Sequence, residues 1–264
     1  MPLSRRSFLN TTPLVLAPAL WVPAYSQTPA PAPAPSFPTQ SPDLVREMVG
    51  VAHRDLVRVK ELLALHPTLA LAAWDWGFGD WEDALGAASH VGNREIAEAL
   101  LKSGARPTIF SAAMLGQLDA VKAFIAASPG IEATPGPHSI TLLRHAMAGG
   151  PRAQAVTDYL KTLPGADARP ASQPITPEQM AELAGDYVYG PGVDERITIA
   201  TSNNANSALT FTRPGRGSRG LTHVGDRTFF PVGAPKVQIK FRTSASGVTM
   251  SVFDPGLVLE ARKS

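Results

Sequence analysis

Aromatic and acidic side chains gather in one short stretch of the chain, WDWGFGDWEDALGAASHVGN, which runs from Trp74 to Asn93. Three of the four tryptophans lie within its first eight residues, with glycines and carboxylates between them. Indole rings can stack on sugars or anchor a partner, and paired carboxylates can act as general acid and base. The stretch could therefore be a sugar-binding platform, a carboxylate active site or a loop that braces a helix.

The bracing and binding interpretations of this stretch both stay open. In the first, Trp74 and Trp81 fill a gap between helical units and the acidic side chains stay solvated. In the second, the stretch is a partner-contact loop with Trp76 and Phe78 as exposed anchors. Catalysis is disfavoured because nothing places two carboxylates across a substrate, so the sequence predicts no catalytic residue. The predicted contact loop comprises Trp74, Asp75, Trp76, Phe78, Asp80, Trp81 and Glu82.

The histidines show no local metal-binding pattern. None of the six forms a His-x-x-x-His or His-Glu pair. His53, His90 and His145 are expected in or beside turns between helices, where a hydrogen-bonding histidine is common. The chain has no cysteine, which excludes thiolate ligands, and no Gly-rich phosphate loop follows a strand. The sequence thus predicts no metal and no cofactor, and leaves open only ligands brought together across the fold. The remaining histidines are His66, His138 and His223.

The charge of the chain gives no reason to expect a nucleic-acid partner. The formal net charge is +2, and the paired arginines Arg5 and Arg6 account for both units. The one local basic cluster, RPGRGSRG from Arg213 to Gly220, is expected to be a solvated hairpin end. Without an extended basic face, binding to nucleic acid is not expected.

The N-terminal segment SRRSFLNTTPLVLAPALWVPAYSQ combines paired arginines with an apolar run that is too short to span a bilayer. Small residues near its end predict cleavage between Ser26 and Gln27. Its start resembles the bacterial twin-arginine export signal. The resemblance implies export of the folded protein by the twin-arginine machinery to the periplasm or beyond, with no stable membrane insertion after cleavage. The residues that carry it are Arg5, Arg6, Phe8 and Leu9.

The middle of the chain has helical apolar spacing in four self-similar segments, VAHRDLVRVKELL, ASHVGNREIAEALL, AAMLGQLDAVKAFI and HAMAGGPRAQAVTDYL. The stretch DALGAASHVGNREIAEALLKSGA resembles an ankyrin repeat, and TLLRHAMAGG follows that family's Thr-Pro-Leu-His-x-Ala pattern loosely. The resemblance implies an array of stacked helical units that serves as a surface for protein contacts. In such an array, Trp74 to Asp83 would occupy a loop between units.

Beyond Gly185 the apolar period changes to two, as in VQIKF and VTMSV, which predicts about eight short strands. A helix capped by Thr176 is expected just before them, in ITPEQMAEL. This pattern favours a small antiparallel barrel or half-barrel. It resembles the lipocalin-like domain appended to bacterial serine hydrolases of the β-lactamase and penicillin-binding class. The Ser-x-x-Lys and Gly-x-Ser-x-Gly motifs of hydrolases do not occur in the chain.

The predicted protein is therefore multidomain, α plus β, with an ankyrin-like helical array followed by a small antiparallel barrel. We expect a non-enzymatic protein, periplasmic or secreted, that contacts a protein or a cell-envelope component. Two alternatives stay open: an enzyme or accessory acting on envelope glycans through the Trp and acid loop, and a carrier of a small hydrophobic ligand in the barrel. The predicted boundaries are a signal over 1–26, a Pro/Ala-rich linker over 27–42, the array over 43–167, a linker over 168–175 and the β-domain over 176–264.

Overall fold

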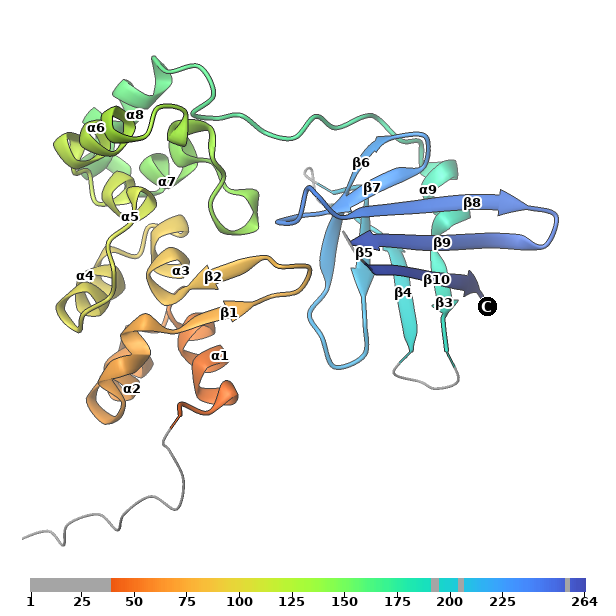
Figure 1. Ribbon diagram of the computed structural model, residues 1–264, viewed down its shortest axis with the longest axis horizontal. Coiled ribbons are helices and arrows are strands. Elements are labelled where there is room, and N and C mark those ends of the chain that lie inside the picture. The colour runs from red at the N-terminus through yellow and green to blue at the C-terminus, as the bar shows by residue number, and fades with distance from the viewer. Residues whose placement is uncertain (1–38, 191–194, 204–206, 255–256) are drawn as a thin grey trace, which may run out of the picture. The chain divides into compact units, whose positions relative to one another are not determined.

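Helices occupy the first half of the described chain and strands the second (Figure 1). The computed structural model describes residues 39–190, 195–203, 207–254 and 257–264. No helix within these ranges is both long enough and apolar enough to cross a membrane. The predicted export motif (Arg5, Arg6, Phe8 and Leu9) and the predicted cleavage between Ser26 and Gln27 lie outside the described residues.

Four helix pairs follow one another, and they coincide with the four segments that the apolar spacing predicts. The stacking of an ankyrin array remains a prediction. The pairs begin at residues 42, 84, 109 and 142, so the intervals between them are unequal. They are α1 (Pro42–Val51) with α2 (Leu56–Leu65), α3 (Ala84–His90) with α4 (Arg94–Lys102), α5 (Ile109–Met114) with α6 (Leu118–Ala127), and α7 (Leu142–Ala148) with α8 (Gln154–Lys161).

Polar side chains fix where most of these helices begin. The first turn of a helix has backbone N–H groups without partners, and a side-chain oxygen just before it can accept from one of them, which contributes about 1 kcal/mol. Asp83 accepts from Gly86 at the start of α3, and Asn93 accepts from Ile96 at the start of α4. Ser41, Asp55, Thr108 and Thr141 cap α1, α2, α5 and α7 in the same way.

A glycine in the turn between paired helices allows a close approach of the backbone. Gly92, between α3 and α4, has a φ of +77°, and a side chain there would meet the carbonyl oxygen of Ala148. Gly116, between α5 and α6, has a φ of +74° and lies equally close to the carbonyl of Arg152. The sequence interpretation that glycine relieves these turns is confirmed at both positions.

The apolar core of the helical region is divided into two clusters. The first includes Met48, Leu85 and Leu100, and is built from α1 to α4 with Met114 of α5. The second includes Leu142 and Leu160, and is built from α5 to α8. We call α1 to α4 the first half of the helical region and α5 to α8 the second half. The halves are in contact, because α5 contributes to both clusters and α3 packs against α5 and α7.

Two irregular segments account for the unequal intervals. The first is a β-hairpin in which β1 (Ala73–Asp75) pairs antiparallel with β2 (Trp81–Asp83). Its turn contains Gly77 and Gly79, with φ of +112° and +74°, as the sequence interpretation expected. The second is the α6–α7 connection, residues 128–141, which contains two short 3₁₀ turns, Ile131–Ala133 and Pro137–Ser139. Two further 3₁₀ turns, Pro67–Leu71 and Gly150–Ala153, lie within the helical region.

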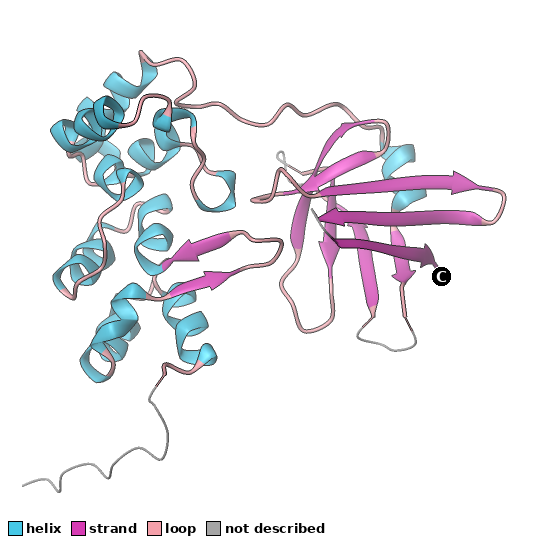
Figure 2. Ribbon diagram, viewed as in Figure 1, coloured by secondary structure: helices cyan, strands magenta, loops and turns pink. Residues whose placement is uncertain are grey.

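Eight antiparallel strands close into a barrel (Figure 2), which confirms the prediction of a small barrel and decides against a half-barrel. The predicted helix precedes them as α9 (Pro177–Leu183), and Thr176 and Gln179 form the expected capping box. The strands are β3 (Gly185–Val188), β4 (Arg196–Thr201), β5 (Leu209–Thr212), β6 (Arg219–Gly225), β7 (Thr228–Pro231), β8 (Gln238–Ser244), β9 (Gly247–Asp254) and β10 (Leu257–Lys263).

Large apolar side chains fill the interior of the barrel. Phe229, Phe241 and Met250 are buried there beside Tyr187. The hydroxyl of Tyr187 donates to the carbonyl of Leu183 at 2.7 Å, so its one polar atom has a partner. Burial raises the pKa of Tyr187, which keeps the phenol neutral. An eight-stranded barrel is just wide enough for side chains to fill, and this one is filled in that way.

Candidate metal centre

His53 lies in the turn after α1, where the helix leaves carbonyl groups without partners. Its Nδ1 lies 3.2 Å from the carbonyl oxygen of Val49 and 3.0 Å from that of Gly50. A ring nitrogen facing two carbonyl oxygens carries the hydrogen, because a carbonyl can only accept. In the tautomer with the hydrogen on Nδ1, the lone pair of Nε2 faces the interior of the site.

Glu82 is buried because of the alternation of side chains along β2. Trp81 is 63% exposed, and Glu82, the next residue, is 1% exposed, since successive side chains of a strand point to opposite faces. The indole Nε1 of Trp76 donates to Glu82 Oε2 at 2.7 Å. Glu82 Oε1 is buried and has no hydrogen-bond partner among the described residues. A buried charged oxygen without a hydrogen bond is costly, and this one points at a group of imidazoles.

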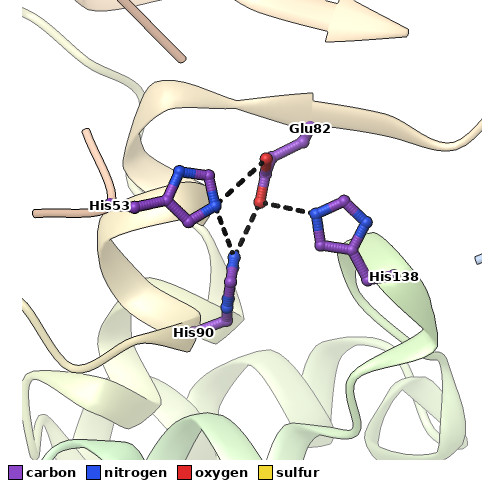
Figure 3. Close-up of side chains that lie close together, drawn as sticks. All are labelled: His53, Glu82, His90 and His138. Atoms are coloured by element: carbon purple, nitrogen blue, oxygen red, sulfur yellow. Dashed lines mark hydrogen bonds and ion pairs between the residues drawn. The ribbon is translucent and has the colours of Figure 1, made fainter. Parts of the chain in front are cut away.

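His90 is the last residue of α3 and points toward both His53 and Glu82 (Figure 3). Its Nε2 lies 3.1 Å from the Nε2 of His53 and 2.9 Å from Glu82 Oε1. The His53 and His90 rings meet edge to face, with centroids 4.9 Å apart. Two Nε2 atoms and one carboxylate oxygen thus meet at one point beside the end of α3.

His138 reaches this point from the α6–α7 connection (Figure 3). Its Nε2 lies 3.3 Å from Glu82 Oε1. Asp80, 4% exposed, accepts from the backbone N–H of His138 at 2.9 Å and faces its Nδ1 at 2.7 Å. The carboxylate therefore fixes the orientation of the ring, as outer carboxylates do for histidines that bind metals. His138 and Ser139 both have a φ of +58°, a conformation uncommon for residues with side chains.

The four donor atoms are spaced as the ligands of one tetrahedral ion would be. Every pair of them lies within 4.8 Å, and the three contacts of Glu82 with the histidines and the contact of His53 with His90 run from 2.9 to 3.7 Å. Zinc–nitrogen and zinc–oxygen bonds of about 2.0–2.1 Å in a tetrahedron place neighbouring ligands about 3.3 Å apart. The cluster of His53, Glu82, His90 and His138, hereafter the His–Glu cluster, has this spacing (Figure 3).

The electrostatics of the cluster favour a negative Glu82 and a cation beside it. Burial raises the pKa of Glu82, but the contacts with His138 and His90 outweigh burial, and the pKa falls to about 2. Burial lowers the pKa of His138, but Asp80 and Glu82 outweigh it, and the pKa rises to about 9. For Asp80, too, the effect of burial is outweighed by His138, and its pKa is lowered. Arg219 of β6 forms an ion pair with Asp80 and balances part of the negative charge, so the positive charge that Glu82 calls for lies at the centre of the cluster.

His145 borders the cluster without joining it. It is fully buried, its Nδ1 lies 2.9 Å from the carbonyl oxygen of Thr141, and its ring centroid is 6.4 Å from that of His90. Burial lowers the pKa of His145 to about 4, so the ring is neutral at physiological pH. It therefore adds no positive charge to balance the two carboxylates.

The predicted contact loop has a different exposure from the one that the sequence suggested. Asp80 and Glu82 are buried, so the expectation that the acidic side chains stay solvated is wrong, because they hold histidines. Trp81 is exposed instead of filling a gap between units. Trp74 and Trp76 are half-buried and pack against the first apolar cluster. Asp75, also half-buried, accepts from the backbone N–H of Gly77, and Phe78 is half-buried with a φ of +60°.

The His–Glu cluster was not anticipated from the sequence, since no two of its members stand in a metal-binding motif. One signal was available. His53 follows the first helix of its pair and His90 ends the first helix of the next pair, and equivalent positions of neighbouring pairs would lie side by side. Glu82 and His138 come from the two irregular segments, whose course no periodic pattern describes. The remaining histidines lie elsewhere, His66 at the end of α2 and His223 on β6.

Comparisons with known proteins add nothing to this geometry: no family model matches the chain, and searches of curated proteins and of solved structures found no match.

Proposed function

We propose that the His–Glu cluster binds one divalent transition-metal ion, and that the helical region is a metal-binding module. The observation that carries the proposal is the convergence of His53, Glu82, His90 and His138, each of which offers one ligand atom within 4.8 Å of the other three. The other polar atoms of His53, His138 and Glu82 already have partners, so the free lone pairs face the centre.

A proton is the competing occupant of this site. A charged His138 between Asp80 and Glu82 would balance part of the negative charge without any metal. In that arrangement the single hydrogen that His90 Nε2 can carry faces both His53 Nε2 at 3.1 Å and Glu82 Oε1 at 2.9 Å, and it can serve only one of them well. One ion bound to all four atoms would satisfy each of them, which is why we favour the metal.

Zinc is the ion that this donor set fits best. Imidazole nitrogen and carboxylate oxygen suit Zn²⁺, which takes four such ligands at tetrahedral positions. Magnesium and calcium prefer oxygen donors, and the cluster supplies only one. Copper(II) binds nitrogen donors more tightly than zinc does but prefers a tetragonal arrangement. The proposal therefore names Zn²⁺ first and treats copper as its main competitor.

Zinc titration of the purified metal-free protein tests this function. We expect one Zn²⁺ per chain by calorimetry and by elemental analysis. His90→Ala should weaken binding by more than the 10–100-fold that loss of an outer-shell partner typically causes, because His90 contributes a ligand atom itself. The matched control is His66→Ala, which removes a histidine outside the cluster. The absence of a 1:1 site, or equal effects of the two variants, would rule the function out.

A second candidate function follows from the exposure of Trp81. A tryptophan that is 63% exposed on a hairpin is a suitable anchor for a protein or cell-envelope partner. This keeps the partner-contact hypothesis, with Trp81 in place of the buried acidic residues. A pull-down from the source cells should recover a partner with the wild-type chain and not with Trp81→Ala. Recovery of the same proteins with the wild-type chain and with Trp81→Ala would rule out Trp81 as the anchor for a partner.

The export signal belongs to the same proposal, because a metal site made of distant segments exists only in a folded chain. A chain carried across the membrane already folded could take up its ion beforehand. Cell fractionation tests the predicted export. The wild-type protein should reach the periplasm or the medium, and a chain with Arg5→Lys and Arg6→Lys should stay in the cytoplasm. Export of both at equal levels would contradict the twin-arginine resemblance.

A further inference from the structure

We infer that the metal ion is a structural link that joins the two halves of the helical region, so that they unfold as one unit. This inference rests on the proposed metal site and adds a role for it. Four protein donors complete a tetrahedron, whereas catalytic zinc sites hold three and leave a position for water or substrate. The donor set of the His–Glu cluster therefore fits a structural ion.

The ligands come from both halves of the helical region. His53 lies between α1 and α2, while Glu82 and His90 flank α3, and all of these helices build the first apolar cluster. His138 lies on the α6–α7 connection, which joins two helices of the second apolar cluster. An ion bound to all four would therefore connect residues that the apolar packing assigns to separate halves.

Contacts already cross between the halves, because α3 packs against α5 and α7, and some of the crossing contacts are polar. Arg94 donates from α4 to the carbonyl of Met114 at 3.3 Å, and Met114 itself packs into the first cluster. Gly92 lies against the backbone of Ala148 in α7. In an array of helix pairs, each pair is stabilised mainly by its neighbours, so distant pairs can unfold separately. A metal ion bound both to the first two pairs and to the α6–α7 connection would make the first and last pairs unfold together.

The α6–α7 connection depends on polar contacts for its position. Neither of its 3₁₀ turns contains a buried residue. The backbone of Gly136 donates to Ile140 at 2.9 Å within the connection, and His138 is held from outside by Asp80 and Glu82. Ile131 packs against the second apolar cluster at the start of the connection, so it is the part around His138 whose ordering relies on the two carboxylates. A metal–nitrogen bond to His138 would supply the strongest contact that the connection makes.

Hydrogen exchange of the full chain, with and without Zn²⁺, tests this link. With zinc, we expect exchange at least tenfold slower both in α1 to α3 and in the α6–α7 connection with α7 and α8. The strands of the barrel contribute no ligand, and β8 to β10 also lack the ion pair that joins Arg219 of β6 to Asp80, so their exchange should not change and serves as an internal control. Zinc that binds but protects only α1 to α3 would overturn the link and leave the metal site standing.

His138→Ala provides the matched variant. It keeps three ligands, so Zn²⁺ should still bind, more weakly, at a concentration set to saturate the site. Zinc should then protect α1 to α3 and no longer protect α7 and α8, while His66→Ala should behave as the wild type. Equal protection of α7 and α8 in His138→Ala would contradict the inference. If His138→Ala does not fold, the comparison of wild-type exchange with and without Zn²⁺ decides the inference alone. If the wild-type protein binds no zinc, both the metal site and the proposed link are ruled out.

Discussion

The barrel and the helical region treat buried polar groups in opposite ways. Among the described residues, Ser207 is the only polar or charged residue of the barrel region that is buried, and the helical region buries the other seven. Two of those seven, Asp80 and Glu82, are carboxylates. The interior of the barrel is apolar, and its one large polar side chain, Tyr187, has a partner in Leu183. The barrel is packed as a scaffold, while the helical region keeps charges where they destabilise the fold unless something balances them.

This difference shows where function is expected. Hydrophobic packing alone would not retain a carboxylate at 1% exposure beside three histidines, because apolar residues of the same volume would often be as stable or more so. The barrel core lacks any such feature among the described residues, and Phe229, Phe241 and Met250 are buried in it. If the comparison is sound, changes among the buried apolar side chains of the barrel should affect stability alone, and changes in the His–Glu cluster should affect metal binding. Arg219 of β6 is the exception, because it forms an ion pair with Asp80.

The largest expected effect is on the barrel. Phe229→Ala removes a fully buried aromatic ring and leaves a cavity, which costs about 3–5 kcal/mol. Urea denaturation should show this loss, while zinc affinity, measured below the transition, should equal that of the wild type. A parallel loss of zinc affinity in the folded variant would show that the two regions are not independent.

Glu82→Gln should have the next largest effect, on metal binding. The change keeps the shape of the side chain and removes its charge, so the cluster loses an anionic ligand and Asp80 becomes the only buried carboxylate beside His138. We expect zinc affinity to fall by more than about 100-fold, measured by competition with a chelator. The control is Glu61→Gln, which disrupts an exposed ion pair with Arg58 and should leave zinc binding unchanged.

Asp80→Asn tests the positioning of one ligand. The amide oxygen can still accept from the backbone of His138, but the negative charge beside Nδ1 is lost. Outer-shell carboxylates of this kind are worth about 10–100-fold in metal affinity, so we expect a loss in that range with the 1:1 stoichiometry kept. A wild-type affinity would show that Asp80 does not orient His138 toward the ion.

The same division separates what could be predicted from the sequence and what could not. The strands of the barrel alternate apolar and polar residues, as Ile239 and Phe241 do on β8, and Thr176 has the pattern of a capping box. These signals are local, and the corresponding predictions of helix pairs, barrel and cap are confirmed. The buried Glu82 was read as a solvated surface charge, because its neighbours Trp81 and Asp83 gave no sign of which face of the strand turns inward.

The position of His138 could not be predicted from the sequence, for a physical reason. Its contact with Asp80 joins residues 58 positions apart, and it depends on a left-handed backbone at His138 and Ser139 that no local preference predicts. Contacts of this kind are made by the fold as a whole. The regular parts of the molecule could therefore be predicted, and the candidate site, built largely from its irregular parts, could not.

Trp76→Phe should have the smallest effect and isolates a single hydrogen bond. The substitution keeps an aromatic ring against the first apolar cluster but removes the N–H that donates to Glu82 Oε2. With that oxygen no longer held, the carboxylate can rotate, and Oε1 is less well oriented toward the three imidazoles. We expect zinc affinity to fall about tenfold, the lower end of the range for outer-shell partners. Trp81→Phe, one residue before Glu82 on the exposed face of β2, should change nothing. If both variants bind zinc as the wild type does, the hairpin positions Glu82 through its backbone alone, and Trp76 contributes only packing.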